Sequence, residues 1–457
     1  MASRDLTTGS IPRHLMALGV PVIGAMLLQS VYAIVDLAWI KRLGEEAVAG
    51  LSINFQIFFV ILALSQVIAT TAMADISQLW GKGERKGARA AFSSFLVVSL
   101  VLGVLTTGGA WLTADVYINA FTSDPAVAEQ GLAYFQINAL TFFSQLLLIV
   151  LGYGLRASGD FISPMVVMVI SVLTNLALDP LLIFGIGEWE GMGIAGAAWA
   201  TVPGQFLALV VYAGLLIRAR RDELRMSFGV PKFSPDFFKQ LIVRGLPAGT
   251  QYLLMSAMLG AVLYAMKPHG AAYTAAAGGG FRVLQQSILP VVALASAAAA
   301  MSGQNMGAAA FDRVRLTSRT VLIWCVIYGA VISGLFLLTP ELFASLFAQP
   351  EEMAVARSYF VWSWPMVIGI SLSMGPTMIL QALKRPMLPL IAALLRLALI
   401  IVGIFAWLVP AQAPPEWVFG LVAVTAIFEG GIGLGLLIWR LKKLPQQSHA
   451  PTPAFAG

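Results

Sequence analysis

Three carboxylates interrupt long apolar runs of the sequence: Asp36, Asp179 and Glu429. A charge placed in hydrocarbon costs roughly 2.5–3.5 kcal/mol on insertion scales, so each carboxylate found there is a candidate for function. Asp36 and Asp179 lie at similar depth below the outer ends of their runs. Two carboxylates that share a poorly hydrated pocket cannot both ionise at low cost, so such a pair is suited to bind and release a proton.

Neighbouring polar residues extend this candidate ion-coupling site. Asn175 lies four residues before Asp179, and Tyr32 lies four residues before Asp36, so each shares a helix face with its carboxylate. Thr201 reaches the same depth in the following apolar run. The oxygens of Asp36, Asn175 and Asp179, with Thr201, could instead ligate a sodium ion. The residues therefore leave proton and sodium coupling open.

A conformational role is expected for Pro21, which lies in the same run as Asp36. Proline removes a backbone hydrogen bond and kinks a helix. Protonation near Asp36 would then change the bend. The purely structural alternative is that Pro21 fits local packing, that Asp36 extends toward Lys41, and that Asp179 is a helix-end residue before Pro180.

The apolar runs of the second half contain Glu429 and two arginines, Arg282 and Arg396. Glu429 adjoins Gly430-Gly431, where close packing between helices is the expected role. Arg396 is expected to reach a partner or the inner surface. Arg282 is a weak candidate for the wall of a substrate cavity, together with Gln251 and Met255.

The composition indicates which kind of secondary structure must hold these candidate residues in place. Of 457 residues, 59% are apolar and only 11% are charged, against roughly 25% charged in ordinary globular proteins. A helix needs about 20 apolar residues to cross a hydrocarbon core about 30 Å thick, and open sheets cannot exist in lipid. The sequence therefore predicts an all-α polytopic membrane protein, with twelve spans near residues 16–40, 47–74, 88–114, 128–154, 162–186, 193–217, 238–266, 272–302, 316–339, 354–382, 387–410 and 416–439.

The distribution of the 28 Lys and Arg residues predicts the orientation. If both termini are cytoplasmic, only Lys41, Arg42 and Lys267 lie in outer segments, as the positive-inside rule requires. The longest polar interruption then divides the chain into an N-lobe (1–217), a cytoplasmic connecting loop (218–237), a C-lobe (238–441) and a cytoplasmic tail (442–457).

The two halves repeat at a nearly constant offset. Gln78 and Gly81 correspond to Gln304 and Gly307, and further along, with the offset shorter by one, Pro164 corresponds to Pro389. Six-helix repeats that both start inside are parallel repeats, which usually enclose a central cavity and rock against each other. In the second half Val262, Ile400 and Ile404 stand where the first half has Asp36, Asn175 and Asp179. Coupling is therefore expected in the first half alone.

Several motifs together resemble one family, over residues 10–440. They are Leu18-Gly-Val-Pro21 with Asp36, Leu43-Gly44, Ala47-Val-Ala-Gly50, Leu155-Arg-Ala-Ser-Gly159 before Pro164, Asn175-Leu-Ala-Leu-Asp179-Pro180, and Gly303-Gln-Asn-Met-Gly-Ala308. The chain resembles the multidrug and toxic compound extrusion (MATE) transporters of the DinF-like type. This resemblance implies a two-lobed exporter driven by a proton or sodium gradient, with an N-lobe cluster on Asp36, Asn175 and Asp179, extended to Tyr32 and Thr201. The acidic residues that NorM-like relatives carry in spans 7 and 10 are absent here.

The expected function is a secondary active antiporter that exports amphiphilic, often cationic compounds. It would be a multi-pass protein of the cell inner (plasma) membrane, a monomer among lipids, with no nucleic-acid partner and no cofactor other than the coupling ion, H⁺ or Na⁺. An enzyme is not expected, because the sequence shows no metal-ligand or nucleophile constellation. The alternative is a flippase for lipid-linked precursors, which would need several cavity cations where only Arg282 and Arg396 qualify. A channel would need no carboxylate pair.

Overall fold

The computed structural model describes residues 5–219 and 225–446. Side chains are described in these ranges except at positions 33, 34, 37, 38, 41, 45, 48, 49, 52, 55, 56 and 271. Residues 220–224 of the connecting loop 218–237 and residues 447–457 of the tail 442–457 therefore lie outside the described residues.

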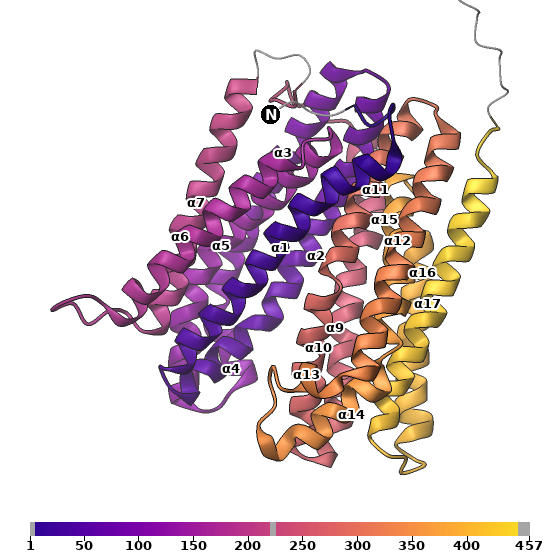
Figure 1. Cartoon of the computed structure of the whole chain (residues 1–457). Helices are drawn as coiled ribbons and strands as arrows, with labels where there is room; N and C mark the ends of the chain where they lie inside the picture. The colour runs from indigo at the N-terminus through magenta and orange to yellow at the C-terminus, as the bar shows by residue number, and fades with distance from the viewer. Residues whose placement is uncertain (1–4, 220–224, 447–457) are drawn as a thin grey trace, which may run out of the picture.

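The first half of the chain forms one group of helices and the second half forms another (Figure 1). The first group consists of α1 (Ile11–Lys41), α2 (Glu45–Gly81), α3 (Arg85–Leu112), α4 (Ala114–Phe121), α5 (Pro125–Ala157), α6 (Ile162–Phe184) and α7 (Ile194–Ala219). The second consists of α8 (Pro235–Gln240), η1 (Leu241–Gly245), α9 (Leu246–Met266), η2 (Lys267–His269), α10 (Ala271–Ser287), α11 (Leu289–Gly307), α12 (Phe311–Leu338), α13 (Pro340–Ala344), η3 (Pro350–Glu352), α14 (Met353–Ser363), α15 (Met366–Ala382), α16 (Met387–Val402), η4 (Gly403–Leu408) and α17 (Glu416–Lys442).

Ten helices in the described residues are long and apolar enough to cross a membrane, and two bent pairs raise the number to twelve. The pairs are α10 with α11, bent by 42°, and α14 with α15, bent by 48°. Pro290 and Pro365 lie at these bends, where the missing N–H and the proline ring interrupt the helix. The twelve expected spans are confirmed. The two bends were not expected, although proline marks both.

The lobes meet in the half of the molecule that holds both described chain ends (Figure 1), the end that the basic residues mark as cytoplasmic. Here α2 packs against α9 and α11, and α1 also packs against α11. Glycines permit the close approach: a Cβ on Gly245 would lie 2.2 Å from the carbonyl oxygen of Val67, and one on Gly249 would lie 2.6 Å from that of Ala63. The core at this end therefore contains buried side chains from both lobes.

The segment before each lobe docks on the opposite lobe. Leu6 is fully buried; its N–H donates to Gln304 Oε1 (3.3 Å), and its carbonyl accepts from Asn305 Nδ2 (3.1 Å). Lys232, the counterpart of Leu6 in the repeat, bonds through its own N–H (2.8 Å) and carbonyl (2.9 Å) to the Ser94 hydroxyl of the first lobe. The two entry segments thus tie the lobes together at the cytoplasmic end.

Candidate functional site

The candidate ion-coupling site lies where α1, α6 and α7 meet. A Cβ on Gly196 would lie 2.1 Å from the carbonyl oxygen of Leu182, and one on Gly204 would lie 2.9 Å from that of Ser171. α7 can therefore approach the backbone of α6 closely on both sides of Thr201. This approach brings the Thr201 hydroxyl into hydrogen-bond range of Asn175.

Asn175 is the centre of a buried hydrogen-bond network. Its amide orientation is assigned from the surrounding donors and acceptors. The nitrogen donates to both carboxylate oxygens of Asp179 (2.9 and 3.0 Å) and to the Tyr32 hydroxyl (2.8 Å). The amide oxygen accepts from the Thr201 hydroxyl (3.0 Å) and from its backbone N–H (3.2 Å). Since Asp179 is fully buried, its charge state is felt directly by a network that connects three helices.

Asp36 of α1 is the second carboxylate of the site. Its side chain is half-buried on α1, and its charge acts on Asp179. Both carboxylates act electrostatically on Tyr32 and on Tyr134 of α5. The structure thus brings together the five residues that the sequence suggested. It also adds Tyr134 of α5, which no helical spacing connects to the others because it is many turns away from each of them in the sequence.

The equivalent place in the second lobe is apolar. Val262, Ile400 and Ile404 are all buried and belong to one hydrophobic cluster of that lobe. The asymmetry expected from the repeat is therefore a difference between a polar network and a packed core.

Pro21 lies inside α1, which runs without a break from Ile11 to Lys41.

A narrow cavity lies between the lobes, with walls from both halves. The residues that line it carry no charge and are Gln66, Thr70, Met73, Tyr153, Tyr252, Ser296, Ala299, Met378, Gln381 and Ala382. Buried Gln66 has no hydrogen-bond partner for its Oε1 in the described residues. Gln251 and Met255 are not part of this lining: the Gln251 amide bonds to Pro247 of its own helix, and Met255 packs on the second-lobe core. Arg282 is exposed on α10.

Arg396 and Glu429 form an ion pair between α16 and α17, with Nη1 and Oε2 2.9 Å apart. The expected partner for Arg396 is thereby identified. The expectation for Glu429 was incomplete: a Cβ on Gly430 would lie 2.8 Å from the Gly369 carbonyl, so helix packing is close there, but the carboxylate itself holds Arg396. The two residues are 33 positions apart, and no local spacing links them, so the sequence alone does not predict the pair.

Comparisons with known proteins agree with this architecture. A FAD transporter of Shewanella oneidensis is 27% identical over 410 residues, covering 88% of this chain and 89% of that protein. The probable multidrug resistance protein YoeA of Bacillus subtilis is 27% identical, covering 78% of each chain. A solved structure of a MOP superfamily transporter from Pyrococcus furiosus superimposes with a TM-score of 0.89 at 20% identity, covering 96% of this chain and 98% of that one.

The sequence model of the MatE family matches twice, at residues 21–181 and 247–407. The two matches are equally long, and the second follows the first at the offset of the internal repeat. Together they cover well over half of the chain. MatE proteins are transporters rather than enzymes, with multiple spans in the inner membrane. The chain therefore belongs to the MatE family of two-lobed membrane transporters.

Proposed function

We propose that the protein is a secondary active antiporter that exports amphiphilic, often cationic compounds in exchange for protons. The observation that carries this proposal is the buried network of Asn175, Asp179, Tyr32 and Thr201 in one lobe, with the charge of Asp36 acting on it. The equivalent place in the other lobe is an apolar core. An antiporter needs a group that binds the coupling ion on one side of the membrane and releases it on the other. Relatives named as probable multidrug resistance proteins support the substrate class.

The network suggests how the binding of a proton to Asp179 moves the surrounding helices. Ionised Asp179 accepts two bonds from the Asn175 amide, which also donates to Tyr32 on α1. A proton on Asp179 removes an acceptor, so the amide and the Tyr32 hydroxyl must rearrange. Pro21 leaves one carbonyl of α1 without its helical partner, which lowers the cost of bending that helix. Proton binding thereby changes the position of α1 against the second lobe.

Sodium coupling is the main competing form of the same proposal, because the carboxylate, amide and hydroxyl oxygens are hard ligands. The deciding experiment measures the substrate-induced pH change inside proteoliposomes, with and without sodium. Proton antiport predicts a pH change that does not require sodium. Export from inverted vesicles that persists after all ion gradients are collapsed would overturn antiport altogether.

A second substrate class is favoured by the uncharged lining of the inter-lobe cavity. Ten lining residues offer amide and hydroxyl groups and two tyrosine side chains, and no carboxylate that would select a cation. With a relative named as a FAD transporter, this lining fits a planar ligand rich in hydrogen-bonding groups, such as a flavin nucleotide. Competition between FAD and a cationic dye for uptake into inverted vesicles separates the two classes.

The flippase alternative loses support, because Glu429 already neutralises Arg396.

A further inference from the structure

The cytoplasmic contact between the lobes is built from equivalent residues on both sides of the pseudo-twofold axis. A Cβ on Gly81 would lie 1.9 Å from the carbonyl oxygen of Gln304, and one on Gly307 would lie 2.0 Å from that of Gln78. No larger residue fits at either glycine without moving the backbone. The glycines that mark the repeat in the sequence therefore lie where α2 and α11 touch.

The two glutamines also reach across the contact in equivalent ways. Gln78 Nε2 donates to the carbonyl of Ala382 (2.9 Å), and Gln304 Nε2 donates to the carbonyl of Ala157 (2.8 Å). Ala157 and Ala382 are themselves equivalent positions of the repeat. Ala382 also lines the inter-lobe cavity, so this contact forms the cytoplasmic wall of that cavity.

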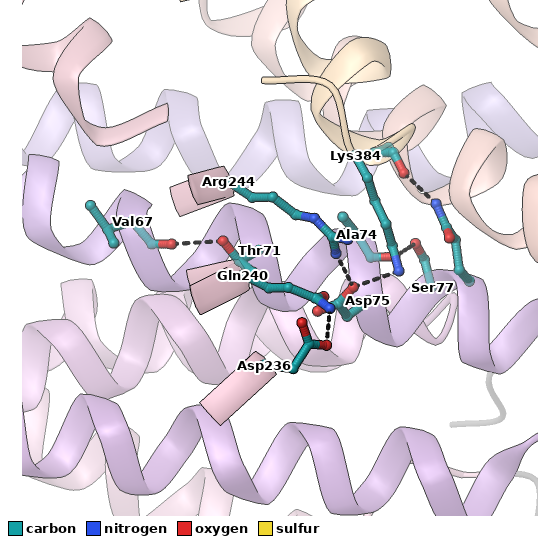
Figure 2. A network of polar contacts seen from close by, with 11 residues as sticks. Val67, Thr71, Ala74, Asp75, Ser77, Asp236, Gln240, Arg244 and Lys384 are labelled. Carbon is teal, nitrogen blue, oxygen red and sulfur yellow. Dashed lines mark hydrogen bonds and ion pairs between the residues drawn. The ribbon is translucent and has the colours of Figure 1, made fainter. Parts of the chain in front are cut away.

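One charged cluster breaks the symmetry of the contact. Asp75, one turn before Gln78 on α2, accepts from Arg244 Nη1 (3.0 Å) and faces Lys384 Nζ at 2.6 Å. Figure 2 shows both cations converging on this carboxylate from the second lobe. The equivalent of Asp75 in that lobe is Met301, which is fully buried. The ionic contact is therefore made once, on one side of the axis.

The backbone at Lys384 supports a specific role for this cluster. The turns after α5 and α15 share two equivalent backbone hydrogen bonds, and in the first lobe the left-handed position is Gly159 (φ 89°). In the second lobe the same position is Lys384 (φ 61°). A side chain at left-handed φ is disfavoured and persists where the surroundings stabilise it. From this position the Lys384 side chain contacts Asp75 of the other lobe.

We propose that Asp75, Arg244 and Lys384 form an ionic latch that holds the cytoplasmic side of the cavity closed. Opening toward the cytoplasm separates α2 from η1 and from the turn after α15, so both cations must leave Asp75. The three side chains are 17–28% exposed, so water and salt reach the latch and it can be released repeatedly. The role of the latch in transport rests on the proposed function. The existence of the latch can be tested without substrate.

The test measures access to the cavity from the cytoplasmic side. Met378, which lines the cavity, is changed to cysteine (Met378→Cys) in a Cys325→Ser background, and inside-out vesicles are treated with a membrane-impermeant maleimide. Asp75→Asn should raise the labelling rate about fivefold, the effect expected of a partly exposed ion pair. Arg244→Met and Lys384→Met should each raise the rate less. The matched control is Arg385→Met, which removes an exposed cation one residue from the latch and should leave the rate unchanged.

An unchanged labelling rate in folded Asp75→Asn would overturn the latch. If that variant does not accumulate, the parent Met378→Cys protein decides: its labelling must accelerate as KCl rises from about 0.02 to 1 M, because salt screens partly exposed charges. A flat salt response would then overturn the proposal. Neither measurement needs a drug or an ion gradient. A failure of the export assays would therefore contradict the proposed antiport without deciding whether the latch exists.

Discussion

Arg396 on α16 and Glu429 on α17 hold each other at 2.9 Å inside the second lobe, where their side chains are only 10% and 15% exposed. Removing one partner leaves an uncompensated charge in an apolar environment, which typically costs about 3–5 kcal/mol. We therefore expect Glu429→Leu to lower the melting temperature of the purified protein strongly. The double variant Arg396→Met with Glu429→Leu should recover most of that loss, because no charge is left unpaired. A double variant as unstable as the single one would show that the pair is not the cause.

Replacement of the N-lobe carboxylates should stop coupled export. Asp36→Asn and Asp179→Asn resemble the protonated carboxyl group in shape but cannot release a proton, so the cycle should halt after loading. We expect gradient-driven export to fall to background in each variant while the protein remains folded in the membrane. Drug binding, measured by fluorescence, should persist because the inter-lobe cavity is a separate place.

Gln251→Leu is the matched control for these variants, since Gln251 bonds only within its own helix among the described contacts. It should retain most of the export activity. Near-normal export by Asp179→Asn would place the coupling group elsewhere and contradict the proposed site. Glu429 is unsuitable as a control, because its ion pair links any transport defect to stability.

The orientation of the chain is open to direct labelling. A single cysteine introduced between positions 220 and 225 should react with an impermeant maleimide only from the cytoplasmic side, because this segment carries a dense group of arginines. The native Cys325 is buried and should contribute little signal. Labelling of intact cells from outside would show that the orientation is the opposite of the expected one, and with it the direction of transport.

The N-terminal segment should stay docked across the physiological pH range. Asp5 accepts from the N–H (2.8 Å) and the hydroxyl (2.6 Å) of Thr7. Partial burial acts to raise the pKa of Asp5, but these bonds and the charge of Arg85 outweigh it, so the pKa lies below the ordinary 3.8. The stabilisation is therefore complete above pH 3.8 and is lost only as the pH falls through the lower folded value.

Hydrogen exchange followed by mass spectrometry checks this expectation at the Leu6 amide. After correction for intrinsic rates, protection should be equal at pH 5.5 and pH 8. Asp5→Asn should exchange about twofold faster at both pH values, a small effect because the group is largely exposed. Loss of protection at pH 5.5 in the unchanged protein would show that another group controls docking.

Local sequence patterns were sufficient for the spans and the repeat, and they pointed to most of the residues that the structure gathers at the candidate site. Apolar length identified twelve spans, and the spacing of Asn175 and Asp179 placed both on one face of α6. The repeat predicts Val262, Ile400 and Ile404 at the equivalents of the site, and the structure adds that the three share one core.

Contacts between distant helices could not be predicted in the same way. The partners of Arg396 and Asp75 depend on how helices rotate and slide against one another, which hydropathy does not encode. Asp75 lies at the end of its apolar run and gives no signal of its own, and Lys384 lies in a polar connection between two spans, where a basic residue is ordinary. Tyr134 was missed for the same reason, since α5 must fold back onto α1 and α6 before its hydroxyl approaches the carboxylates.

The crossed docking of the two entry segments has a consequence for biosynthesis. Lys232 can bond to Ser94 as soon as it leaves the ribosome, because the first lobe is already made. Leu6 must wait for Gln304, which is 298 residues later in the chain. At roughly 5–20 residues per second, this interval is about 15–60 s. The segment that precedes the first lobe is therefore made before that lobe but reaches its final position only after most of the second lobe exists. A chain truncated after the first lobe would leave the apolar Leu6 side chain without its site.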